Sequence, residues 1–150
     1  MTPPRTPLLA LAVLLPALAS AAPRRPLAVA AAANLRPTLD AVARAFEAER
    51  PDAEVRVTYG ASGTLHAQIV AGAPFDLFLS ADRDSPRALV AAGLARDEAV
   101  YAIGQLVAWV PNGSRLDLAR DGLAALARPE VRKVAIPNPA HAPYGRAAVA

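Results

Sequence analysis

Short apolar runs alternate with amphipathic stretches along this chain from residue 27 onward. Residues 27–33 predict a buried strand, and Leu39, Val42 and Phe46 then recur on one helix face until Pro51 ends the helix. Strands joined by helices pair in parallel, so the pattern predicts an α/β protein with a mainly parallel sheet. The other predicted strands are 54–59, 75–80, 103–110 and 131–136; the other predicted helices are 64–71 and 85–92, each closed by a glycine, then 122–127 and a helix from residue 146.

The first residues have the arrangement of a secretory signal peptide. Arg5 precedes an apolar run at 8–19, and Ala19-Ser20-Ala21 provides the small residues of a cleavage site. The run is shorter than the roughly 20 apolar residues that span a bilayer, and Pro16 interrupts it. We therefore predict that residues 1–21 are removed on export and that the mature protein is a periplasmic monomer.

The residue types present argue against several kinds of site. The chain has no cysteine, so it has neither disulfides nor thiolate metal ligands. Its two histidines, His66 and His141, lie far apart without ligand-like spacing, so we predict no metal centre and no cofactor. The formal net charge of +3 comes from scattered basic residues without a basic run, and no nucleic-acid partner is expected.

Two turns place a small polar residue between a predicted strand and a predicted helix. Asn34 lies in the first turn, at 30–35, and Ser62 lies in the second, at 59–65. The first N–H groups of a helix have no intrahelical acceptor and carry a partial positive charge, so they attract anions. Asn34 and Ser62 are suited to cap these helices, and either can also donate to a ligand oxygen. Both readings, simple caps and an anion site, remain open from the residues alone.

Three segments together carry a resemblance to a known family. They are AAAANL at 30–35, YGASGTLHAQIVAGAPFDLFLSAD at 59–82 and NPAHAPYGRAA at 138–148. In order and approximate spacing they resemble the periplasmic molybdate-binding proteins of ABC importers. The resemblance implies a type II periplasmic binding protein fold, in which two α/β lobes close on an oxyanion that is handed to a membrane permease and its ATPase.

The resemblance also implies a set of ligand-binding residues. Side-chain donors fall on Asn34 and Ser62, and a backbone N–H donor falls on Tyr144. Ala33 and Gly63, beside the two polar residues, would lend further backbone N–H groups. No Asp or Glu lies in the two turns at 30–35 and 59–65 or in the proline-rich loop at 138–148, which suits a dianion that can only accept hydrogen bonds.

The same resemblance divides the chain into a signal peptide, 1–21, a first lobe, 22–100, and a crossover with the beginning of a second lobe, 101–150. The chain stops soon after the helix predicted from residue 146 begins, so we expect a fragment with an incomplete second lobe. We expect residues 27–81 to pack as a βαβαβ core, residues 96–150 to be poorly anchored, and this chain alone to bind oxyanions weakly.

Other functions compete with molybdate capture. Tungstate matches molybdate in size and charge, and sulfate or phosphate are further oxyanion alternatives; a structural or sensory domain of the same fold is another. Gly60-Ala61-Ser62-Gly63 is close to the nucleophile elbow of a serine hydrolase, but the fifth position is Thr64. His66 follows Ser62 by four residues on the same predicted helix, and no clear acidic partner lies between Ser62 and His141. We therefore predict a binding protein and not an enzyme. Arg36 is interpreted either as a residue of a solvated helix face or as a residue whose charge adds to the electric field at the mouth of the cleft.

Overall fold

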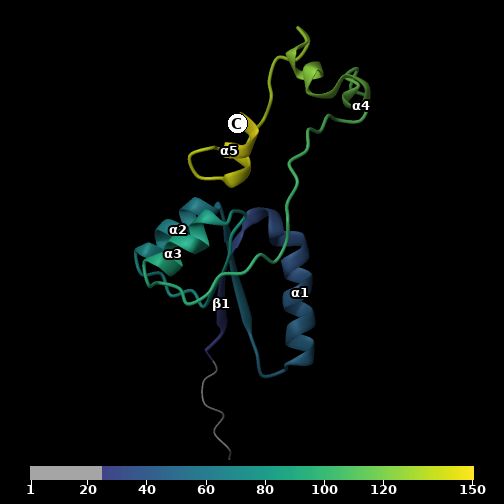
Figure 1. Cartoon of the computed structure of the whole chain (residues 1–150). Coiled ribbons are helices and arrows are strands. Elements are labelled where there is room, and N and C mark those ends of the chain that lie inside the picture. The colour runs from purple at the N-terminus through teal and green to yellow at the C-terminus, as the bar shows by residue number, and fades with distance from the viewer. Residues whose placement is uncertain (1–24) are drawn as a thin grey trace, which may run out of the picture.

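The computed structural model describes residues 25–150, and its first half forms a three-stranded sheet covered by helices (Figure 1). The strand order is β2-β1-β3, and both pairings are parallel. Leu27 lies opposite Val55, and Val29 lies opposite both Val57 and Leu77. The elements are β1 (Leu27–Ala32), α1 (Arg36–Glu49), β2 (Val55–Gly60), α2 (Ser62–Val70), β3 (Leu77–Leu79) and α3 (Asp84–Ala91). The predicted α/β class and βαβαβ core are confirmed.

The core is built around the central strand. Residues 29–32 of β1 are buried, and three of these four residues are alanines. In Figure 1, α1 lies on one side of β1, and α2 and α3 lie together on the other. Leu65 of α2 and Leu89 of α3 are the large side chains buried among these helices. The small side chains of β1 leave room for helices on both faces, so a few leucines supply most of the apolar volume.

Two helices end at the glycines that the sequence pattern identified. After α2, the Gly72 N–H donates to the Ile69 carbonyl at 2.9 Å and the Ala73 N–H donates to the Gln68 carbonyl at 2.9 Å. This pair of bonds is a Schellman motif, which needs a left-handed residue, and Gly72 supplies it with a φ of 91°. Gly93 ends α3 in the same way, with a φ of 70°.

Two of the strands predicted in the later part of the chain are wrong. Residues 103–110 and 131–136 are not strands, and within the described residues the sheet contains only β1, β2 and β3. An apolar alternating run becomes a strand only when another strand satisfies its backbone groups, and residues 25–150 offer these two runs no such partner. Trp109 is consequently 77% exposed. The short helices here are α4 (Leu118–Asp121), the 3₁₀ turn η2 (Gly122–Ala127) and α5 (Pro143–Val149).

The predicted signal peptide lies outside the described residues. Within residues 25–150, no helix combines the length and the apolar character needed to cross a membrane.

The loop from β3 to α3 is organised by Asp82. Its carboxylate accepts hydrogen bonds from the Ser85 N–H at 3.0 Å and the Ser80 hydroxyl at 3.1 Å, and it pairs with Arg146 at 2.6 Å. Burial alone would raise the pKa of Asp82, but the bonds from Ser85 and Ser80 and the charge of Arg146 outweigh it and lower the pKa. The ionised carboxylate is therefore the form that stabilises the fold.

Replacing Leu65 by alanine should lower the free energy of unfolding by about 2–5 kcal/mol, because its side chain is only 1% exposed and would leave a cavity. Val70, on the same helix and 55% exposed, is the matched control, and Val70→Ala should change the free energy of unfolding far less. Urea unfolding followed by circular dichroism measures both. Equal losses in the two variants would contradict this description of the core.

Acid should remove the stabilisation due to Asp82. Because folding lowers the pKa of Asp82, its contribution is complete above the unfolded-state value of about 3.9 and is lost as the pH falls through the lower folded value. The free energy of unfolding, measured with urea from neutral to acid pH, should therefore fall less steeply with acid in Asp82→Asn than in the wild type. Parallel declines would show that Asp82 does not contribute in this way.

Candidate anion-binding site

Three loops meet at one edge of the sheet because the strands are parallel. The chain leaves β1, β2 and β3 at their carboxyl ends, and in parallel strands these ends lie at the same edge. Asn34 follows β1, Ser62 follows β2, and Asp82 follows β3. Residues far apart in the sequence are thereby brought to one place.

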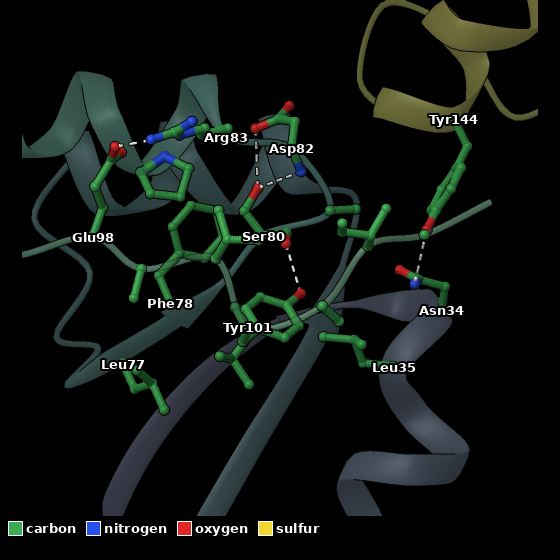
Figure 2. A pocket seen from close by; sticks show the side chains of 18 of the residues that line it. Asn34, Leu35, Leu77, Phe78, Ser80, Asp82, Arg83, Glu98, Tyr101 and Tyr144 are labelled. Atoms are coloured by element: carbon green, nitrogen blue, oxygen red, sulfur yellow. Dashed lines mark hydrogen bonds and ion pairs between the residues drawn. The ribbon is translucent and has the colours of Figure 1, made fainter. Parts of the chain in front are cut away.

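Asn34 does not cap a helix. It lies in the 3₁₀ turn η1 (Ala33–Leu35), and α1 begins after Leu35 without a side-chain cap, so the capping role, one of the two open for Asn34, is not adopted. The continuous turn from β1 into α1 leaves no extended residue at position 34. Ala33 and Asn34 are both exposed, and the Asn34 amide donates to the Tyr144 hydroxyl at 3.5 Å. The side chain is thus free of its own helix and directed toward the end of the chain (Figure 2).

Ser62 is also not an N-cap, because it is the first residue of α2 and the extended residue before it is Ala61. Its hydroxyl oxygen accepts the Ala81 N–H at 2.9 Å, and the residue is 1% exposed. This long-range bond replaces the local capping bond and ties α2 to the loop after β3. Since the oxygen accepts from Ala81, the hydroxyl proton remains available for donation.

Gly63 meets the C-terminal segment through its backbone. Its N–H donates to the His141 carbonyl at 3.1 Å. A Cβ at Gly63 would lie 3.0 Å from that carbonyl oxygen, so only glycine allows this approach without a shift. The N–H that the resemblance assigns to a ligand therefore has a protein acceptor in this conformation.

Tyr144 lies on α5 and points its ring toward Asn34 (Figure 2). Its hydroxyl packs against Gly104, where an added Cβ would collide with it unless the tyrosine side chain shifted. Both Asn34 and Tyr144 line a cavity of about 610 Å³ between the sheet edge and residues 97–104. Ser62, Gly63 and Ala33 are not lining residues of this cavity. The structure thus places Asn34 with Tyr144 and Gly63 with His141, and it buries Ser62 against the Ala81 N–H.

Sequence reasoning missed the side chains that surround the cavity. Tyr101 donates its hydroxyl to the Ser80 carbonyl at 2.6 Å, and burial, together with the neighbouring Tyr144, raises the pKa of Tyr101 (Figure 2). Glu98 pairs with Arg83 at 3.6 Å and with Arg87 at 3.5 Å. The sequence shows only that Glu98 is acidic and that Arg83 and Arg87 are basic. The spacing of these residues does not indicate that they form ion pairs.

Arg36 is held by an aromatic ring. Its guanidinium carbon lies 4.1 Å from the centre of the Tyr59 ring. The Tyr59 hydroxyl donates to Asp40 at 2.5 Å; burial, followed by this bond and the charge of Asp40, raises the pKa of Tyr59 to about 12. Tyr59 therefore stays neutral, and its ring holds the guanidinium of Arg36, the first residue of α1, by a cation–π contact.

Ser62 has none of the partners of a catalytic serine among residues 25–150. Its hydrogen bond is to Ala81, and no hydrogen bond joins its hydroxyl to His66 or His141 in that part of the chain. The same range contains no group of three or more His, Asp or Glu side chains placed to hold a metal ion.

Comparison with known proteins places the chain in a family. The model of the family described as bacterial extracellular solute-binding protein matches residues 27–150. The molybdate-binding protein ModA of Rhodobacter capsulatus is 38% identical over 103 residues, which are 67% of this chain and 39% of that protein. ModA of Azotobacter vinelandii is 37% identical over 134 residues, which are 88% of this chain and 52% of that protein.

A solved structure is similar over a smaller part. The periplasmic molybdate-binding protein of Azotobacter vinelandii matches with a TM-score of 0.43 and 42% identity, over 45% of this chain and 29% of that chain. The present chain spans between 39% and 52% of the length of the two curated relatives. On the match to residues 27–150, the chain belongs to the family of bacterial extracellular solute-binding proteins.

Proposed function

We propose that this chain is part of a periplasmic protein that captures molybdate or tungstate and delivers it to the permease and ATPase of an ABC importer. The observation that carries the proposal is the meeting of three separate segments at the carboxyl edge of the sheet. Asn34 reaches Tyr144 at 3.5 Å, and Gly63 reaches His141 at 3.1 Å. Two curated relatives bear the name molybdate-binding protein.

The donors at this edge suit a dianion that only accepts hydrogen bonds. The Asn34 amide carries two N–H groups, and the Ser62 hydroxyl keeps a proton to donate. Because α2 begins at Ser62, the first N–H groups of this helix have no intrahelical acceptor and carry the positive end of its dipole. Backbone N–H groups of Ala33 and Tyr144 would complete the set on this proposal, and the Gly63 N–H would join them when the ligand replaces the His141 carbonyl as its acceptor.

Two of the carboxylates that line the cavity, Asp82 and Glu98, carry paired charges. Asp82 pairs with Arg146 at 2.6 Å, and Glu98 pairs with Arg83 and Arg87. The guanidinium beside each of these two carboxylates reduces the repulsion that a bound dianion would otherwise meet. This pairing supports anion capture at an edge whose loops also contain acidic residues.

For the whole protein we propose two α/β lobes with the ligand cleft between them. Residues 22–100 would supply the first lobe, and residues 101–150 would supply the crossover and the start of the second. Export through the signal peptide at 1–21 and action as a monomer without a cofactor complete this proposal. The intact mass of the exported protein tests the cleavage directly, because a species still beginning at Met1 would contradict it.

Removing a donor should weaken binding without unfolding the chain. Asn34→Ala and Ser62→Ala should each lower the affinity for molybdate roughly ten- to a hundred-fold, because each removes a hydrogen bond to a charged ligand. Isothermal titration calorimetry on the protein extended to the length of its relatives measures this effect. Asn112→Ala and Ser114→Ala, in an exposed turn, are the matched controls and should bind as the wild type does.

Ser62→Ala also leaves the Ala81 N–H without its acceptor, so its folding must be checked by circular dichroism. Asn34 is exposed and gives the cleaner result. Unchanged affinity in both variants would remove these residues from the site. Titration of the wild type with tungstate, sulfate and phosphate decides among the oxyanions, and tighter binding of sulfate or phosphate would replace molybdate as the ligand.

A further inference from the structure

The segment 138–149 is held to the sheet edge by one contact from each of three loops. The loop after β1 gives the Asn34 contact to Tyr144, the loop after β2 gives the Gly63 contact to His141, and the loop after β3 gives the Asp82 contact to Arg146. In Figure 1, α5 lies beyond the end of the sheet where α2 begins. The segment therefore faces the proposed anion donors.

The three contacts differ in strength. The Asn34 amide and the Tyr144 hydroxyl are 3.5 Å apart, which is the long limit for a hydrogen bond. The bond from Gly63 to His141 joins two neutral backbone groups at 3.1 Å. The pair of Asp82 and Arg146, at 2.6 Å, joins two full charges, and charge-assisted bonds are roughly twice as strong as neutral ones.

The Asp82 carboxylate is held in place by groups other than Arg146. The Ser85 N–H and the Ser80 hydroxyl hold its carboxylate, and its side chain is 13% exposed. The Arg146 side chain is 48% exposed and lies on the short helix α5. A fixed carboxylate loses little side-chain entropy on pairing, so this ion pair avoids much of the cost that makes most surface pairs weak.

We infer that Asp82 and Arg146 are positioning residues, whose ion pair holds the segment 138–149 over the anion donors and thereby slows the release of a bound oxyanion. The inference rests on the proposed function for its ligand. The three contacts join protein groups to one another. Arg146 acts through the position of His141 and Tyr144, and it is not itself a ligand-binding residue.

The test compares Arg146→Gln with the wild type in two measurements. The first needs no ligand: hydrogen exchange of the Gly63 amide, followed by NMR, should become about twofold to tenfold faster, because its acceptor at His141 is held less often. The second is the dissociation rate of molybdate from the wild type and the variant by stopped flow, which should rise by a similar factor, while the association rate changes less. Arg56→Gln, which removes an arginine paired with Glu54 at 2.7 Å on β2, is the control and should change neither rate.

A double-mutant cycle with Asp82→Asn shows whether Arg146→Gln acts through the ion pair or through the folding of the loop after β3. If the ion pair carries the effect, Arg146→Gln should have little further effect on Gly63 exchange in the Asp82→Asn background. Unchanged Gly63 exchange in Arg146→Gln, or full additivity in the cycle, would overturn the inference. Faster exchange with unchanged molybdate release would overturn the link to ligand retention. Faster exchange in a protein that binds no molybdate would instead leave the closure contact standing and refute the proposed function.

Discussion

β1 is hydrogen-bonded to a parallel strand on each side, and this pairing determines where the loops and helices around the sheet lie. Because both pairings run in the same direction, the loops after all three strands leave at one edge. The pairing of Ala32 with Gly60 brings the ends of β1 and β2 level, so Asn34 and Ser62 start from adjacent positions. A shift of one residue in this register would turn the half-buried face of β2, which alternates with an exposed face, to the opposite side.

The same central strand determines how the sheet is packed. Ala30 and Ala31 fill little volume, and buried leucines from α2 and α3 supply the larger side chains. Ser62 then adds a polar connection, because its buried hydroxyl accepts the Ala81 N–H from the next loop. The start of α2 is consequently fixed both by apolar packing and by a satisfied hydrogen bond, which makes it a rigid support for a binding site.

Local sequence signals identified the sheet core, because its elements depend on near neighbours. The Schellman motif at Gly72 needs only residues 68–73, and the periodic spacing of apolar residues predicts the helices. The runs at 103–110 and 131–136 have the composition of strands, but a strand also needs a partner, and none lies within the described chain. The capping role that the sequence allowed for Ser62 is not adopted for a related reason, since its hydroxyl oxygen accepts the N–H of Ala81, 19 positions away. The pair of Asp82 and Arg146 spans 64 positions and has no local signature at all.

The exposed position of Trp109 has a consequence for how this molecule can be observed. It is the single tryptophan of the chain, and it lies outside the sheet, in the run 103–110. Its fluorescence therefore reports the solvent environment of that run, whereas far-ultraviolet circular dichroism reports all the strands and helices, most of which lie in residues 27–91. The two signals follow different parts of one polypeptide, so agreement between their transitions would mean that both parts unfold as a single cooperative unit.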